Sequence, residues 1–315
     1  MNEFHTVLLA VLPVFGVMIV GILMRKWNWL TEEADKSLLR VTVNLLTPCL
    51  IFDSILQNQA LKKIETLALA PAVGFGTVAL GMAAGYFFKR MSGLRERSAL
   101  AMFIVCVGLY NYGYISVPLA TSLFDRETVG VLFVHNLGVE IALWTLGVMI
   151  LSGHGTGSGW KKIFNPPVIA VIVTLPLNFL HGDQWIPQPI LITIKMLGVC
   201  AIPMGLILIG AIMADHLHEF HSRSGWRPII ASCLLRAALL PILFLLLAKV
   251  LPCSLELKRV IVVQAAMPTA TFALVLARHY GGDAATALRI VVATSVIGLV
   301  SIPFWIRFGM KFVGL

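Results

Sequence analysis

Charged residues are scarce in this sequence: 12% of its 315 residues are Asp, Glu, Lys or Arg, and 58% are hydrophobic. Because roughly a quarter of the residues in soluble domains are charged, this composition excludes an ordinary soluble domain and indicates an integral membrane protein. The net charge of +9 would suggest a nucleic-acid partner in a soluble chain. Here the Lys and Arg residues stand in short loops between apolar runs, so we expect a lipid bilayer and no nucleic acid as partner.

Cysteine pairs and catalytic motifs are also missing. The five cysteines are scattered and form no C-x-x-C pair, which favours small buried side chains over a disulfide framework or a zinc site. The loop 214–227 holds three histidines, but HEFH at 218–221 is one residue short of the H-E-x-x-H zinc motif. We therefore predict a solvated loop there. Without a nucleophile elbow or a set of metal ligands, we expect neither an enzyme nor a bound cofactor.

Long hydrophobic runs dominate the chain instead. A membrane-spanning helix needs about 17–25 predominantly apolar residues. That rule predicts ten spanning segments, which are residues 5–25, 37–57, 65–88, 98–124, 127–151, 165–181, 188–213, 228–250, 256–280 and 284–309. The sixth segment is the weakest, because it is short and contains Pro166, Pro167 and Pro176. The sequence therefore predicts an all-α membrane protein with ten transmembrane helices.

A polar, glycine-rich linker at 152–164 divides the ten segments into five and five. An odd number of spans in each half makes the second half enter the membrane in the opposite direction, which predicts an inverted repeat of 1–151 and 165–315. Lys and Arg are more frequent on the side reached after the first segment, so we predict that this side, with the linker, is cytoplasmic. Both termini are then expected outside.

Two of the segments, 98–124 and 255–280, carry a proline flanked by polar residues at corresponding places in the two halves. In hydrocarbon an unsatisfied backbone group costs several kcal/mol, so a broken helix persists only where protein or a wet cavity satisfies it. Paired interruptions of this kind indicate the substrate site of a transporter near the bilayer midplane. We therefore place the expected site at these two breaks.

Six stretches carry a resemblance to a known family. They are NLLTPCLIF (44–52), YNYGYISVPL (110–119), FNPPV (164–168), PMGLILIGA (203–211), QAAMPTATFALVLARHYG (264–281) and SIP (301–303). Together they run nearly end to end, and the chain resembles the auxin efflux carrier family. The resemblance implies a fold like that of bile-acid symporters and sodium–proton antiporters. A scaffold domain of helices 1, 2, 6 and 7 would face a transport domain of helices 3–5 and 8–10, in which broken helices 4 and 9 cross.

The resemblance also implies a function. Bacterial members of the family are organic-anion permeases of the inner membrane. We therefore expect a secondary transporter of small carboxylates, such as malonate, malate or auxin-like monocarboxylates, with an elevator-type movement and a homodimer through the scaffold domain. The alternative is a sodium-coupled symporter of a larger anion, although the absence of an acidic residue beside Asn111 weakens a sodium site there. Substrate identity, direction of flux and coupling to H⁺ or Na⁺ stay open.

The family motifs assign substrate-binding residues to both breaks. Those residues are Tyr110, Asn111, Gly113 and Pro118 in the first break, Gln264, Pro268 and Thr269 in the second, and Pro48 in the second segment. The amide of Asn111 would bind a carboxylate, while freed backbone N–H groups add the positive ends of helix dipoles. A structural alternative is that these polar residues only repair hydrogen bonds at the broken backbone.

Three charged residues within the apolar segments are candidates for ion coupling or charge relay: Glu140, Arg236 and Asp53. Glu140 is the only carboxylate deep in the second half of the fifth segment, and a charge near the bilayer centre costs at least about 2.5–3.5 kcal/mol. The plant carriers have an amide at the matching place, so Glu140 is a hypothesis for ion coupling or substrate contact. Arg236 in the eighth segment is its candidate salt-bridge partner, which gives the structural alternative. Asp53, on the second segment, is predicted to line the cavity.

Overall fold

The computed structural model describes residues 3–152, 159–216 and 225–315, and within these parts every regular element is a helix. His218 and His221, and residues 153–158 of the predicted linker, lie outside the described residues. In the described parts of the chain, seven helices are long and apolar enough to span a membrane, and two shorter apolar helices accompany them. The chain is therefore a multi-pass membrane protein. The count of ten crossings, the inverted relation of the halves and the outside position of the termini stay predictions.

The helices follow one another along the chain with short connections. The first half contains α1 (Glu3–Lys26), α2 (Glu32–Val41), α3 (Thr47–Ile55), α4 (Ile64–Phe87), α5 (Arg97–Gly108), α6 (Ser116–Leu123), α7 (Arg126–Ala142) and α8 (Val148–Ser152). The second half contains α9 (Pro166–Phe179), α10 (Gln188–His216), α11 (Arg227–Leu234), α12 (Leu240–Val250), α13 (Leu255–Ala265), α14 (Phe272–Tyr280) and α15 (Ala284–Val313).

Three of the long helices contain a wider, π-helical turn. These turns span Thr42–Leu46 between α2 and α3, Leu143–Gly147 between α7 and α8, and Leu235–Leu239 between α11 and α12. A single π-helical turn disturbs the regular i→i−4 hydrogen bonding without ending the helix, and such turns are frequent at functional sites. Each of them lies beside or within the region described below as the site.

The fourth and ninth segments are interrupted, as the sequence predicts, and each consists of two short helices. The first break separates α5 from α6 at 109–115, and the second separates α13 from α14 at 266–271. Pro268 lies within its break, whereas Pro118 lies in the first turn of α6 and not at the interruption. A proline fits this first turn because its missing N–H would be unpaired there in any case.

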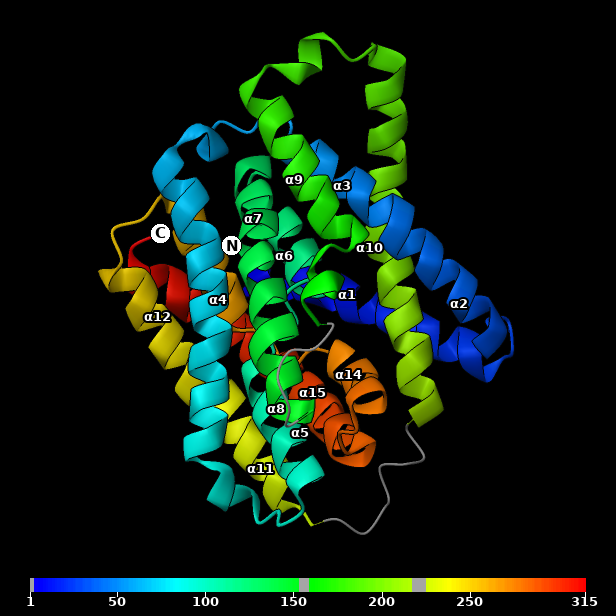
Figure 1. Ribbon diagram of the computed structural model, residues 1–315, viewed down its shortest axis with the longest axis vertical. Helices are drawn as coiled ribbons and strands as arrows, with labels where there is room; N and C mark the ends of the chain where they lie inside the picture. Colours follow the sequence, from blue (N-terminus) through cyan, green and yellow to red (C-terminus); the bar gives the residue numbers. More distant parts are fainter. Residues whose placement is uncertain (1–2, 153–158, 217–224) are drawn as a thin grey trace.

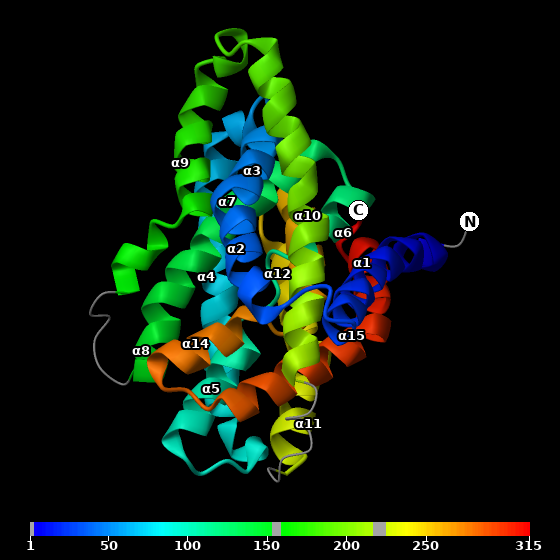
Figure 2. The same cartoon turned by 90° about the vertical axis from the view of Figure 1, so that its right-hand side faces the viewer.

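Helix α7 occupies the centre of the bundle, with α4 on one side and α3 and α9 on the other (Figure 1). Helix α3 contacts both α9 and α10, and Figure 2 shows it between them. Helix α10 also packs along α1. The two broken helices meet within the bundle, where α13 contacts α7 and α6. This arrangement brings the breaks next to α3, α7 and α9.

Helices α4 and α7 approach so closely that glycine is required on both. A Cβ added to Gly74 would collide with the backbone carbonyl oxygen of His135, and one added to Gly138 would collide with that of Pro71. Membrane helices gain van der Waals contact when small residues allow such close approach. The contact holds α7, which carries Glu140, firmly against α4.

We therefore expect Gly74→Ala to destabilise the protein by about 1–3 kcal/mol, because the added methyl group forces α4 and α7 apart. Gly76→Ala is the matched control, since a Cβ at this neighbouring position of α4 meets nothing within 4 Å. Because alanine has a higher helix propensity than glycine, Gly76→Ala should leave the stability of the protein unchanged or increase it. Thermal unfolding in detergent measures both variants. Equal melting temperatures for the two alanine variants would contradict the close contact.

Candidate functional site

The two interrupted helices cross, and their broken segments pair with each other. The N–H of Asn111 donates to the carbonyl of Pro268 at 2.8 Å, and the N–H of Ala270 donates to the carbonyl of Leu109 at 2.9 Å. Tyr110 and Thr269 therefore face each other in an antiparallel bridge. Each broken helix thus supplies hydrogen-bond partners for backbone groups that the other helix leaves unpaired, as a low-dielectric environment requires.

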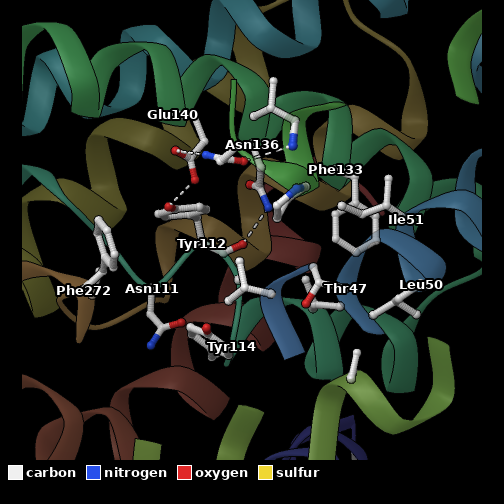
Figure 3. Close-up of a pocket in the computed structure, with 18 of the residues that line it drawn as sticks. Thr47, Leu50, Ile51, Asn111, Tyr112, Tyr114, Phe133, Asn136, Glu140 and Phe272 are labelled. Carbon is white, nitrogen blue, oxygen red and sulfur yellow. Dashed lines mark hydrogen bonds between the residues drawn. The ribbon is translucent and has the colours of Figure 1, made fainter. Parts of the chain in front are cut away.

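A cavity of about 280 Å³ opens beside this crossing (Figure 3). Its walls come from both breaks and from α3, α7, α9 and α10. The polar residues that line it are Thr47, Asn111, Tyr112, Tyr114, Asn136, Glu140, Trp144, Asn165 and Thr271. Among the described residues that line the cavity, none is Lys, Arg or His. The cavity therefore combines one carboxylate with neutral hydrogen-bonding groups and apolar walls.

Asn111 presents an unused hydrogen-bond donor to this cavity. The side chain is 3% exposed, and its Oδ1 accepts the N–H of Ile115 at 3.0 Å, which fixes the orientation of the amide. Within the described parts of the chain, no residue accepts a hydrogen bond from its Nδ2. The donor therefore remains available to a ligand.

Backbone donors accompany Asn111 at the same wall. Four lining residues have a backbone N–H that makes no hydrogen bond within the described chain: Gly113, Tyr114, Thr271 and Phe272. The first two precede the N-terminus of α6, and the other two lie at the N-terminus of α14. Helix N-termini carry partial positive charge, so both favour a negative group in the cavity.

Glu140 lies on another wall and accepts three hydrogen bonds. Its Oε1 accepts from the hydroxyl of Tyr112 at 2.7 Å, and its Oε2 accepts from the indole N–H of Trp144 at 2.7 Å. The amide of Asn165 donates to the same Oε2 at 3.1 Å. All three partners are neutral donors, so a carboxylate satisfies each of them.

Asn165 and Asn136 connect this wall to the neighbouring helices. Asn165 is the N-cap of α9, because its Oδ1 accepts the N–H of Val168 at 3.1 Å, and its amide therefore ties α9 to Glu140 on α7. Asn136 donates to the backbone carbonyl of Tyr112 at 2.8 Å and accepts from the amide of Gln264 at 3.2 Å. One amide thus joins α7 to both broken helices.

The predicted substrate-binding residues divide into two groups. Asn111, Gly113 and Pro118 line the cavity. Tyr110 does not: it is fully buried, its hydroxyl bonds to that of Thr77 at 2.8 Å, and its ring packs against Phe244. Tyr110 therefore supports the crossing from behind.

The predicted residues of the second break also lie behind the cavity wall. Thr269 donates through its hydroxyl to the carbonyl of Cys106 at 2.9 Å, Pro268 accepts from Asn111, and Gln264 bonds to Asn136. Thr269 and Pro268 thus bond to backbone at the crossing, as the structural alternative expects, whereas Gln264 bonds to a side chain of α7. Pro48 lies in the first turn of α3 outside the lining, and its neighbour Thr47 lines the cavity instead.

Arg236 requires a correction, because it is not the partner of Glu140. Its guanidinium donates to the carbonyl of Val107 at 3.3 Å and to that of Met267 at 2.5 Å, and it lies over the ring of Tyr110. Both carbonyls belong to chain ends at the crossing, where helix C-termini carry partial negative charge. The cation is therefore used by the two interruptions themselves.

Asp53 also lies away from the main cavity. It accepts a hydrogen bond from Arg126 at 3.5 Å and lines a second cavity together with Arg126 and Lys195. Asp53 is therefore absent from the lining of the main cavity, where the sequence analysis expects it. A position near the end of α3 brings it next to the start of α7 and not to the crossing.

Six polar lining residues are not among those that the sequence assigns to the site: Thr47, Tyr112, Tyr114, Trp144, Asn165 and Thr271. Two had a usable signal, because Tyr112 belongs to the YNYGY motif, and Asn165 precedes two prolines as a helix N-cap does. Trp144 lies four residues after Glu140, on the same helix face. His135 and Asn136 precede Glu140 by about one turn on the same helix face, so the sequence indicates a polar cluster there, and of these two only Asn136 lines the cavity.

A multi-pass helical bundle with a cavity at two crossed, interrupted helices defines a membrane transporter as the class of protein. Sequence comparison gives the family: the model described as membrane transport protein matches residues 6–159 and 156–306. The chain therefore belongs to the auxin efflux carrier family, as its motifs predict.

Two relatives, each described as an uncharacterized transporter, support this assignment. One, from Methanothermobacter thermautotrophicus, is 25% identical over 303 residues, which cover 94% of this chain and 96% of the relative. The other, from Methanocaldococcus jannaschii, is 26% identical over 303 residues with the same coverage. The similarity to both transporters therefore extends over nearly the whole chain.

The separate partners of Glu140 and Arg236 lead to a quantitative prediction. Arg236→Leu should lower stability by about 1–3 kcal/mol, since it leaves buried carbonyls without donors. Combining it with Glu140→Gln should add the two single effects within about 0.5 kcal/mol, because the residues share no hydrogen-bond partner. Chemical denaturation of the four proteins measures this cycle. Rescue of Arg236→Leu by Glu140→Gln would instead indicate a direct ion pair.

Proposed function

We propose that the protein is a secondary transporter of small organic anions, with carboxylates such as malonate, malate or auxin-like monocarboxylates as the substrate class. The observation that carries this proposal is the free Nδ2 of Asn111, beside unpaired backbone N–H groups, in a cavity at the crossing of two broken helices. Membership of a transporter family sets the general activity.

The chemistry of this wall favours a carboxylate. Donors on Asn111, Gly113 and Thr271 belong to a side chain and to backbone, so they bind an anion without bringing a mobile cation into the membrane. Charge-assisted hydrogen bonds of this kind are roughly twice as strong as neutral ones. The N-termini of α6 and α14 add their positive ends from two different helices. The cavity wall thereby gains positive potential without a basic residue among its described lining residues.

We further propose that the substrate moves by an elevator-type mechanism. The cavity lies between two groups of helices, because α3, α9 and α10 form one side, and the breaks with α7 form the other. Helix α10 packs along α1 and α3, which corresponds to the expected scaffold. The α4–α7 contact and the pairing of the two breaks join the other helices into a second body. Sliding of this body would carry the cavity across the membrane.

The sodium-coupled alternative finds no support at Glu140. Hard cations bind to sets of oxygen atoms, whereas Tyr112, Trp144 and Asn165 direct hydrogens towards the carboxylate. Arg236 already donates to the freed carbonyls at the crossing, where a cation would otherwise find oxygen ligands. Coupling to protons stays a prediction.

The test concerns Asn111. Asn111→Ala should weaken carboxylate binding at least tenfold, because a hydrogen bond to a charged group contributes about 1.5–3 kcal/mol and about 1.4 kcal/mol corresponds to a factor of ten. Titration calorimetry with C2–C6 mono- and dicarboxylates measures affinity, and counterflow in liposomes measures transport.

Asn178→Ala is the matched control for this experiment. Asn178 is another buried amide, which donates to the carbonyl of Asn58 and does not line the cavity. Its loss should lower stability but leave affinity unchanged. Wild-type affinity in a folded Asn111→Ala protein would remove Asn111 from the site, and the absence of counterflow with every carboxylate would contradict anion transport.

A further inference from the structure

Glu140 is a membrane-embedded carboxylate without a cationic partner in the described chain. Acidic residues within membranes normally pair with a cation or with each other. The candidate partner Arg236 is committed to two carbonyls at the crossing. Lys162 lies near this wall, but its ammonium is over the rings of Trp144 and Tyr280, 5.6 Å and 4.9 Å from their centroids. Among the described residues, the Glu140 carboxylate is therefore contacted by neutral donors only.

The carboxylate is also open to the cavity that the proposed substrate would occupy. Glu140 is half-buried and is one of the lining residues. Figure 3 shows Glu140 and Asn111 on opposite sides of Tyr112, so the two groups form separate poles of one site. The pole at Asn111 offers donors only, whereas the pole at Glu140 offers a negative charge. A ligand that spans the cavity meets opposite requirements at its two ends.

The walls between the poles are largely apolar. Phe133, Phe272 and Val171 line the cavity together with other hydrocarbon side chains. An apolar lining favours the hydrocarbon body of a ligand and penalises any charge that is not paired at a pole. The cavity therefore tolerates charge on a ligand only at the two ends that reach Asn111 and Glu140.

From these two poles we infer that Glu140 selects the substrate: the site takes a monocarboxylate whose far end carries an ammonium or hydroxyl donor, and it rejects dicarboxylate dianions. This inference rests on the proposed function and narrows it, because it keeps the monocarboxylates of the proposed substrate class and excludes the dianions malonate and malate. The carboxylate of the substrate binds at Asn111 and the freed N–H groups. Its donor end adds a further hydrogen bond to the three that Glu140 accepts, or the positive charge that the described residues do not supply to it.

Rejection of dianions follows from electrostatics in a low-dielectric site. A second carboxylate near Glu140 would place two like charges together, and no Lys, Arg or His among the described lining residues would offset them. A donor end gains instead a charge-assisted hydrogen bond to an acceptor that is already held in place by three neighbours. Specificity then comes from repulsion of the wrong ligand as well as attraction of the right one.

The experiment compares matched acids that differ only at the far end. Four- and six-carbon monocarboxylates ending in methyl, hydroxyl or ammonium are titrated calorimetrically into the purified protein at neutral pH, beside succinate and adipate. The wild type should bind the hydroxy and amino acids at least tenfold more tightly than the dicarboxylate of equal length. In Glu140→Gln, dicarboxylate affinity should rise at least tenfold and amino-acid affinity should fall.

Glu127→Gln is the matched control, because Glu127 lies on α7 but does not line the cavity, and it should keep the wild-type order. Succinate or adipate binding as tightly as the hydroxy acid in the wild type would overturn the inference, as would an unchanged order in Glu140→Gln. In both cases binding itself would still support anion transport. Failure of every acid to bind would count against the proposed function and the inference together.

Discussion

The exchange of backbone hydrogen bonds between two broken helices is the constraint on which the rest of the structure depends. Two backbone hydrogen bonds allow both helices to end inside a medium that provides no water. They run from the N–H of Asn111 to the carbonyl of Pro268 and from the N–H of Ala270 to the carbonyl of Leu109. Arg236 then donates hydrogen bonds to carbonyl groups that these backbone bonds leave without a donor. Donors at the opposite ends of the breaks remain free and face the cavity. A requirement of stability thereby creates a binding surface.

Much of this architecture could be predicted from the sequence, because apolar length and paired polar interruptions have few other solutions in a membrane. Proline alone could not locate the breaks. Pro71 and Pro203 lie inside continuous helices, and Pro118 lies within α6. The interruption before α6 depends on pairing with a segment more than 150 residues away, and no local signal contains that information. The sequence therefore predicts that both breaks exist, but it does not predict the residues at which they begin and end.

The site was predicted in part for a similar reason. Asn111 and Glu140 were recognisable as polar groups where hydrocarbon is expected, and both reach the cavity. Sequence could not tell whether Thr269, Gln264 and Arg236 face a ligand or the backbone, because either use satisfies a buried polar group. The structure shows them bonded behind the wall. Because Arg236 bonds at the crossing, Glu140 has no cationic partner among the residues that the structure describes.

The most direct test of this account is a structure of the protein determined with 4-hydroxybutyrate bound. The account predicts the carboxylate at about 3 Å from Asn111 Nδ2 and from the unpaired N–H groups at the N-termini of α6 and α14. It predicts the hydroxyl group at Glu140. A carboxylate bound beside Arg126 and Lys195 in the second cavity, with the crossing left without ligand, would contradict the claim that broken helices build the anion site.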